Sequence, residues 1–255
     1  MLIDTHCHLT DERYNSVAEV INNFKLVGGG KAITVGYDLN SSISCDKLTK
    51  EFFEVYSMVG VHPSDAIQVT DEGLNLIKEL SKNEKCVAIG EIGLDYHYDG
   101  YDKRLQQDAF IKQICLADEL NLPISIHSRE ATKDTLDILK SYKSKLNQGG
   151  VMHCFSGSLE TAREYLNLGL YISFAGPVTF KNAGVLTEVA KFVPNDRFLI
   201  ETDSPYLTPH PFRGSVNQPK MVDLVARKLA EIKKIDYSVA VDLSTNNAHT
   251  LFKKL

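Results

Sequence analysis

The chain has 255 residues, of which 43% are hydrophobic and 24% are charged. This balance is typical of a folded, soluble protein and excludes collagen-like, coiled-coil and disordered chains. The formal net charge of -5 argues against a protein that coats DNA or membranes through broad electrostatic attraction, although a local basic groove is compatible with it. No apolar run reaches the roughly 18 residues that a membrane-spanning helix needs.

The cysteines predict a reducing compartment. Their number is odd, and no two of them form a Cys-x-x-Cys motif, so reduced thiols are expected. The first residues show no basic region followed by an apolar stretch, as a secretory signal would. We therefore expect a cytoplasmic protein. The five cysteines are Cys7, Cys45, Cys86, Cys115 and Cys154.

Eight short apolar runs, spread over the whole chain, predict β-strands. Short continuous apolar runs are typical of strands that are buried on both faces of a parallel sheet. The predicted strands cover residues 2–5, 32–36, 56–61, 87–91, 123–127, 150–153, 170–174 and 197–201.

Helices are predicted between the strands. Apolar residues from Val17 to Val27 recur at helical spacing, and the run Gly28–Gly30 is expected to end this helix. Ser158 is a candidate helix N-cap. Residues 219–255 are expected to be helical and to pack outside the strands. Two further apolar stripes predict helices at 74–80 and 105–120.

A strand followed by a helix, repeated eight times in about 250 residues, predicts a (β/α)₈ TIM barrel. We expect residues 1–255 to form one domain, because no linker or low-complexity segment divides the chain. A doubly wound sheet is the alternative fold. It is disfavoured because no glycine-rich phosphate-binding fingerprint follows a strand.

Seven polar residues lie at or just after the carboxyl ends of the predicted strands, where barrel enzymes place their active sites. Histidine and carboxylate side chains are common ligands of divalent ions such as Zn²⁺ and Mn²⁺. Two histidines at positions i and i+2 of a strand also face the same way. The seven residues are His6, His8, His62, Glu91, His127, His153 and Asp203.

Each of these residues also has a simpler interpretation. Glu91 could be a core carboxylate paired with an arginine, and His127 could be a hydrogen-bonded core histidine. His153 beside Cys154 could belong to a Cys/His metal site, although strand alternation predicts that Cys154 and Cys7 point away from the histidines. The metal hypothesis is favoured because independent core residues have no reason to gather on one rim.

Six ligands are more than one catalytic Zn²⁺ ordinarily takes, so the set predicts two ions, which need a bridging group. A carboxylate has two oxygens and can bridge. Glu91 is central in the strand order and is the predicted bridge. Asp203 can contact both an ion and a water molecule, which suits a general base.

Over nearly its full length the chain resembles the TatD-like metal-dependent deoxyribonucleases of the amidohydrolase superfamily. The matching motifs are residues 4–9 (DTHCHL), 60–63 (GVHP), 88–96 (AIGEIGLDY), 123–129 (PISIHSR), 153–157 (HCFSG) and 201–207 (ETDSPYL).

The resemblance implies a TIM barrel that binds two divalent ions, with Zn²⁺, Mn²⁺, Mg²⁺, Co²⁺ and Ni²⁺ as candidates. It implies hydrolysis of phosphodiesters from the 3′ ends of DNA, with no membrane and no obligatory protein partner. One ion would be held by His6, His8, Glu91 and Asp203, and the other by Glu91, His127 and His153.

His62, Arg129 and Arg213 are candidate contacts to the substrate phosphate or leaving group, although surface salt bridges are an equal alternative for the two arginines. Asp95 could orient a ligand histidine or fix its own loop. Three loop tyrosines could stack on bases or simply pack on the rim. They are Tyr96, Tyr98 and Tyr101.

Three functions remain open from the sequence. A nuclease acting on DNA ends is favoured by the full motif set, and a basic pocket around His62, Arg129 and Arg213 would support it. A small-molecule amide or ester hydrolase could use the same centre, and an apolar, closed pocket would support that alternative. A non-catalytic metal-binding protein is least favoured, because a structural site does not need two ions on a barrel rim.

Overall fold

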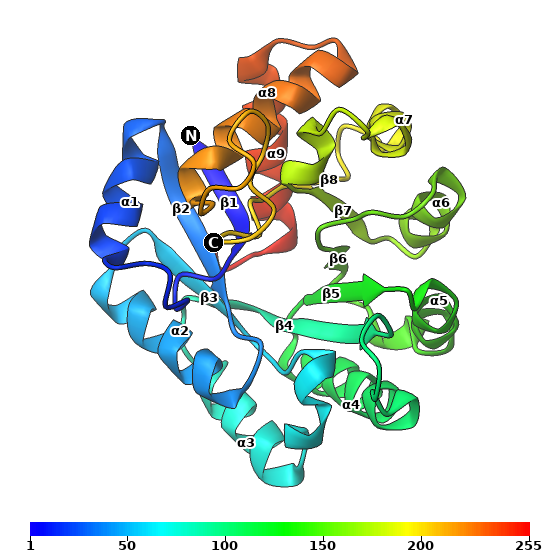
Figure 1. Ribbon diagram of the computed structural model, residues 1–255. Helices are drawn as coiled ribbons and strands as arrows, with labels where there is room; N and C mark the ends of the chain where they lie inside the picture. The colour runs from blue at the N-terminus through cyan, green and yellow to red at the C-terminus, as the bar shows by residue number, and fades with distance from the viewer.

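The computed structural model describes residues 1–255 and confirms the predicted (β/α)₈ barrel (Figure 1). Its eight strands are parallel and neighbour one another in chain order, with helices around them. The strands are β1 (Leu2–Cys7), β2 (Gly29–Val35), β3 (Val55–Val59), β4 (Cys86–Asp95), β5 (Ile124–Arg129), β6 (Gly150–Met152), β7 (Tyr171–Phe174) and β8 (Phe198–Ile200).

A polar side chain caps the beginning of five of the nine helices. The Ser158 hydroxyl accepts a hydrogen bond from the backbone N–H of Thr161, which confirms the predicted N-cap. The helices are α1 (Val17–Leu26), α2 (Leu39–Glu51), α3 (Asp71–Leu80), α4 (Lys103–Leu120), α5 (Thr132–Ser141), α6 (Leu159–Asn167), α7 (Gly184–Phe192), α8 (Val222–Lys233) and α9 (Tyr237–Leu251). The five capped helices are α1, α2, α3, α4 and α6. Four short 3₁₀ turns are η1 (Pro63–Gln68), η2 (Lys143–Lys145), η3 (Gly176–Thr179) and η4 (Pro219–Met221).

Helix α2 carries almost no apolar stripe and could not be located from hydrophobic periodicity. Its buried face consists of small or polar residues, and its start depends on a reciprocal capping box between Asp38 and Ser41. Polar partners, rather than apolar spacing, therefore place this helix. Its buried residues are Ser41, Ser42, Cys45, Asp46 and Thr49.

Side-chain hydrogen bonds and the loop after β8 join β8 to β1. The buried Asp4 carboxylate accepts hydrogen bonds from the backbone N–H and the hydroxyl of Thr202, at 2.9 and 2.6 Å. Beyond the end of β8, Asp203 N–H donates to the His6 carbonyl at 2.9 Å, and His8 N–H donates to Ser204 at 2.7 Å. The chain after β8 therefore lies beside the end of β1, which brings Asp203 to the two histidines.

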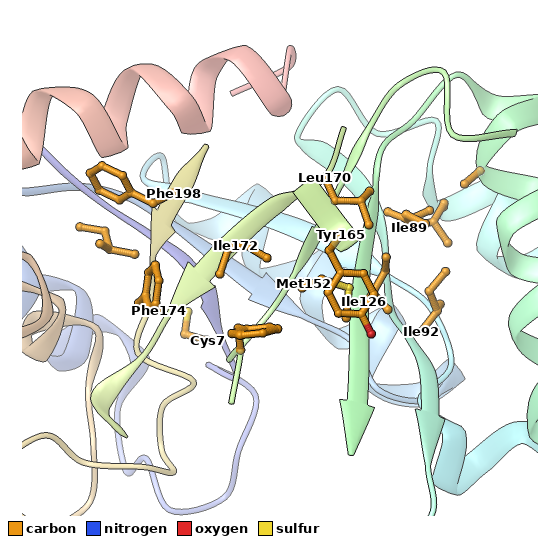
Figure 2. Packing of buried hydrophobic residues seen from close by; sticks show 14 of the residues in the cluster. Cys7, Ile89, Ile92, Ile126, Met152, Tyr165, Leu170, Ile172, Phe174 and Phe198 are labelled. Carbon is orange, nitrogen blue, oxygen red and sulfur yellow. The ribbon is translucent and has the colours of Figure 1, made fainter. Parts of the chain in front are cut away.

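Two apolar clusters form the core. The larger one lies between the strands and the surrounding helices, and Figure 2 shows Cys7 within it beside Ile172 and Phe174. The smaller one joins side chains of seven strands, which can meet only inside the barrel. Leu251 and Phe252, at the end of α9, belong to this inner cluster. The prediction that the whole carboxyl-terminal stretch packs outside was therefore wrong for α9, which closes the amino-terminal end of the barrel.

The sequence predicted that the fourth strand ends at Glu91, and this prediction was wrong. Strand β4 continues to Asp95 and remains paired with β5 as far as Arg129. Gly93 permits this extension, because a Cβ atom there would lie 2.0 Å from the His127 carbonyl oxygen. Glu91 and Asp95 therefore both project from one strand.

The run Gly28–Gly30 is also divided differently from the prediction. Only Gly28, with a φ of +86°, follows the helix, whereas Gly29 and Gly30 begin β2. The Phe24 ring and the Met1 side chain fill the space that side chains at these two positions would need. Along the whole chain, no helix combines the length and apolar character required to cross a bilayer.

Candidate active site

The Glu91 carboxylate lies among five histidines at the carboxyl-terminal mouth of the barrel. Its Oε1 atom lies 2.7 Å from His153 Nε2, 2.8 Å from His127 Nδ1 and 4.0 Å from His62 Nε2. Its Oε2 atom lies 3.5 Å from His6 Nε2 and 3.9 Å from His8 Nε2. Each carboxylate oxygen therefore faces its own group of imidazoles, and no arginine contacts it. The interpretation of Glu91 as a core carboxylate paired with arginine was wrong.

Asp203 is a second carboxylate next to His6 and His8. Its Oδ1 atom lies 3.4 Å from His8 Nε2 and 3.9 Å from His6 Nε2. Its backbone has a φ of +54°, in the left-handed region that costs a residue with a Cβ atom about 1 kcal/mol or more. Such backbone strain is common where a side chain must point into a functional site.

Four overlapping groups of side chains at this mouth could each hold a divalent ion, among them His6, His153 and Glu201, and His62, Asp95 and His127. The other two groups fall within the predicted ligand sets. Their donor types are imidazole nitrogens and carboxylate oxygens, which suit Zn²⁺, Mn²⁺ and related ions. Both ring nitrogens of His6 are buried without a hydrogen-bond partner, an arrangement that costs free energy unless a ligand satisfies them. The donor set therefore fits metal ions. The two groups within the predicted ligand sets are His6, His8 and Asp203, and Glu91, His127 and His153.

The charges at the mouth are strongly coupled. Burial alone would raise the pKa of Glu91, but His153, His127 and His6 outweigh it and hold that pKa well below its usual value. Burial opposes protonation of His153, yet Glu91 and Glu201 raise the pKa of His153 well above its ordinary value. The pKa of Asp203 is likewise lowered, by His8 and its neighbours against burial. Both carboxylates are thus held ionised and can act as ligands.

Asp95 fixes the orientation of His127. Its Oδ2 atom lies 3.0 Å from His127 Nε2, and its Oδ1 accepts a hydrogen bond from the His97 backbone at 2.9 Å. If His127 Nε2 carries the proton and donates to Asp95, then His127 Nδ1 is free to bind an ion beside Glu91. The backbone N–H of Asp95 also donates to the Gln106 side chain, and the backbone carbonyl of Asp95 accepts from it. Asp95 therefore contacts both His127 and its own loop.

Glu201 is a second buried carboxylate beside one of these histidines, and the sequence analysis missed it. Its Oε1 atom lies 3.4 Å from His153 Nδ1 and accepts a hydrogen bond from the Cys154 backbone at 2.6 Å. Its Oε2 accepts from the Ser173 hydroxyl at 2.5 Å. The only signal in the sequence was a carboxylate at the end of a predicted strand, and strand alternation does not say which histidine it would face.

Of the three candidate substrate contacts, His62 lies beside Glu91, whereas the two arginines lie on aromatic rings. His62 Nε2 is 4.0 Å from Glu91 Oε1, and burial lowers the pKa of His62 to about 4. Arg129 lies 5.2 Å above the Tyr98 ring, and Arg213 lies 4.1 Å above the Phe180 ring. Neither arginine is among the ion pairs of the structure, so the salt-bridge alternative was wrong for both.

The loop tyrosines separate into two kinds. Tyr96 and Tyr101 stack on each other at 4.8 Å, and the Tyr96 hydroxyl donates to Asp134. Tyr98 is 67% exposed and contacts Arg129. Packing on the rim therefore describes Tyr96, whereas Tyr98 and Tyr101, which is 40% exposed, remain accessible. All five cysteines are free thiols, and no candidate metal group includes one.

The fold and the site together define a metal-dependent hydrolase with a TIM barrel. The family described as TatD related DNase matches residues 3–253, so the chain belongs to the TatD family. A metal-dependent hydrolase of Bacillus subtilis (strain 168), YabD, is 48% identical over 99% of both chains. Its counterpart in Escherichia coli (strain K12), YcfH, is 40% identical over 98% of this chain and 95% of its own length. Both names carry the description uncharacterized.

Solved structures agree with this assignment. The TatD homolog YJJV of Escherichia coli K12 covers 99% of this chain and 98% of its own, with 29% identity and a TM-score of 0.93. An amidohydrolase of Saccharomyces cerevisiae shares the fold at a TM-score of 0.83 and 20% identity, over 98% of this chain and 99% of its own. Both structures therefore have the same barrel fold as this chain.

Proposed function

We propose that the chain is a phosphodiesterase that removes nucleotides from the 3′ end of DNA with the help of two divalent ions. The observation that carries the proposal is the position of the Glu91 carboxylate, whose two oxygens face separate groups of histidines. One carboxylate serving two ions roughly 3.5 to 4 Å apart is the arrangement of two-metal hydrolases. In this proposal one ion is held by His6, His8, Glu91 and Asp203, and the other by Glu91, His127 and His153.

The candidate ions are Zn²⁺, Mn²⁺, Mg²⁺, Co²⁺ and Ni²⁺. When bound, such ions lower the pKa of water and offset charge on phosphoryl oxygens. Asp203, held ionised beside His8, is the group that takes the proton from the attacking water. Asp95 and Glu201 keep His127 and His153 in fixed orientations, so that the site does not have to reorganise during the reaction.

A charged substrate is favoured over a small neutral amide or ester. His62, which is neutral at pH 7, can donate a hydrogen bond near Glu91, and Arg129 and Arg213 add positive charge at the rim. Both guanidinium groups lie on aromatic rings and are not neutralised by carboxylates, so they are available to phosphates. An enzyme that grips only a strand end needs few such contacts, which is compatible with the net charge of -5.

The test uses a 5′-labelled single-stranded oligodeoxynucleotide. The metal-stripped protein is supplied with Mg²⁺, Mn²⁺ or Zn²⁺ singly, and products are separated by length. We expect a metal-dependent ladder that shortens from the 3′ end and is absent for Glu91→Gln and Asp203→Asn. An oligoribonucleotide of the same sequence and a labelled 3′ end serve as substrate controls.

Two outcomes would contradict the proposal. Internal cuts without a ladder would exclude the exonuclease. A protein that demonstrably binds the metals but leaves every oligonucleotide intact would exclude DNA ends, and small phosphoester and amide substrates would then be the ones to assay.

A further inference from the structure

A group of exposed aromatic and basic side chains lies beside the catalytic groups and has no assigned role. Tyr37 is 41% exposed and Tyr206 is 47% exposed. Their ring centres lie 5.9 and 6.1 Å from that of His8, each meeting it edge-on. The guanidinium of Arg13 lies 4.2 Å above the Tyr206 ring. We call Arg13, Tyr37 and Tyr206 the rim shelf.

The rim shelf is built from three neighbouring loops at the barrel mouth. Arg13 follows β1, Tyr37 follows β2 and Tyr206 follows β8. These are the strands on the side of the mouth where His6, His8 and Asp203 lie. Arg129, at the end of β5, and Tyr98, after β4, belong to other strands. None of the three rim-shelf residues is among the substrate contacts considered above.

Hydrogen bonds hold the rim shelf in place without covering it. Asp11 binds Arg13 through two bonds of 2.7 and 2.8 Å, to Nε and Nη2, while Arg13 Nη1 makes no bond within the chain. The Tyr37 carbonyl accepts from the His62 backbone at 2.7 Å, and the Tyr206 carbonyl accepts from the Asn217 side chain at 2.6 Å. Fixed groups lose little conformational entropy when a ligand binds them.

Large aromatic side chains that are exposed next to a catalytic centre offer apolar faces that a ligand can cover. Aromatic rings and guanidinium planes are the surfaces on which proteins stack nucleobases. The nearest ligand atoms on this side are those of His8 and Asp203, beside which the proposed reaction places the scissile phosphate. A base is joined to that phosphate through a single sugar.

We propose that the rim shelf is a nucleobase subsite, in which Tyr206 and Tyr37 stack on the base of a nucleotide adjacent to the scissile phosphate. This inference rests on the proposed function. Arg13 keeps the Tyr206 ring in position and offers Nη1 to the base or to the neighbouring phosphate. Because stacking uses the face that every base possesses, the subsite accepts all four bases and selects nucleotides over base-free phosphodiesters.

The test compares oligonucleotides with and without a base at defined positions. The full-length, metal-loaded protein is assayed on an intact oligodeoxynucleotide and on two versions whose terminal or penultimate nucleotide is an abasic tetrahydrofuran unit. Tyr206→Ala is expected to raise KM on the intact substrate about 5- to 150-fold, the effect of removing one stacking contact, with little change in kcat. Tyr206→Phe, which keeps the ring, should restore the wild-type KM.

The discriminating result is the loss of this effect on one of the abasic substrates, where wild type and Tyr206→Ala should become equivalent. Phe53→Ala is the matched control, because Phe53 is 85% exposed and lies just before β3, at the opposite end of the barrel. A KM that is unchanged by Tyr206→Ala, or raised equally on intact and abasic substrates, would contradict the proposed nucleobase subsite.

A failure of the proposed function is distinguishable from a failure of the subsite. If the wild-type protein cleaves no DNA, the exonuclease is excluded, and the rim shelf is then tested by equilibrium binding of dAMP against deoxyribose 5-phosphate. Tighter binding of dAMP that is lost in Tyr206→Ala supports the subsite. Equal binding of the two compounds contradicts it.

Discussion

Glu91 Oε1 lies 2.7 Å from His153 Nε2, a contact that joins β4 to the residue directly after β6 across the barrel mouth. The other oxygen of the same carboxylate faces His6 from β1. Residues separated by more than 60 positions in the chain thus share one carboxylate. This relationship makes Glu91 the group on which the proposed two-ion centre depends.

Replacing Glu91 by glutamine should remove one ion from each chain. The amide keeps the shape of the side chain, but its nitrogen cannot act as a ligand and it lacks the negative charge. We expect fewer bound ions in native mass spectrometry and a fall in kcat/KM of about 100- to 1,000-fold. Unchanged metal stoichiometry in Glu91→Gln would contradict the bridging role.

Two substitutions of Asp203 should separate its chemical role from its backbone conformation. Asp203→Asn and Asp203→Ala both remove the carboxylate, so each should lower kcat by about 100- to 10,000-fold. Asparagine tolerates the φ of +54°, whereas alanine does not, so the alanine variant should be less stable by about 1 kcal/mol. Urea unfolding of the two variants measures the difference. Equal stabilities would mean that the backbone relaxes when the side chain is lost.

Asp95→Asn should weaken metal binding without removing a ligand. An amide accepts the His127 Nε2 proton less strongly than a carboxylate does, so His127 becomes a poorer and less oriented ligand. Titration with a competing chelator is expected to show an affinity about 10- to 100-fold lower. Asp242→Asn, an exposed position on α9, is the control. A metal affinity equal to that of Asp242→Asn would show that Asp95 fixes its own loop and does not influence metal binding through His127.

Gly90→Ala should disturb the centre through the backbone. A Cβ atom at this position would lie 2.7 Å from Ser125 Cβ and 3.1 Å from the Ser125 carbonyl, so β4 would have to move away from β5 beside Glu91. We expect a loss of about 1 to 3 kcal/mol in unfolding free energy and weaker metal binding. Gly184→Ala, where nothing lies within 4 Å of the added atom, should be close to neutral. Similar stabilities of the two variants would contradict this steric argument.

We expect Lys233 to make the unfolding free energy of the protein change with pH in the alkaline range. Partial burial lowers the pKa of Lys233 from its usual 10.5 to about 8, and its ammonium group donates to the Val193 carbonyl at 2.6 Å. Between pH 8 and 10.5 the unfolded chain keeps this proton while the folded chain releases it, so the contribution of Lys233 to unfolding free energy rises with pH.

Unfolding of wild type and Lys233→Met at pH 7 and pH 10.5 checks this sign. The wild-type protein should gain about 1 to 2 kcal/mol relative to the variant over this range, after allowance for the partial exposure of the side chain. Lys181→Met, at an exposed position, should show no such difference. If the wild-type protein gained the same stability relative to Lys181→Met as relative to Lys233→Met, the pH dependence would come from groups other than Lys233.

The sequence alone determined the barrel and most of the residues at its mouth. Short apolar strands alternating with helices leave few arrangements that bury all eight strands, and a closed parallel barrel is one of them. Because all carboxyl ends of such strands meet at one rim, residues as distant as His6 and Asp203 could be predicted to lie together. Hydrophobic periodicity failed where burial is polar, as in α2, and where glycine allows a strand to continue, as in β4.

Only the tertiary structure decided which atoms face each other. Chain spacing does not reveal that the two oxygens of Glu91 point to different histidines, or that Glu201 and Asp95 each contact one ring. It also could not show that Tyr37 and Tyr206 flank His8, because they come from separate loops. These relationships depend on side-chain directions at the ends of different strands. The packing of the closed barrel sets those directions, and no local pattern records them.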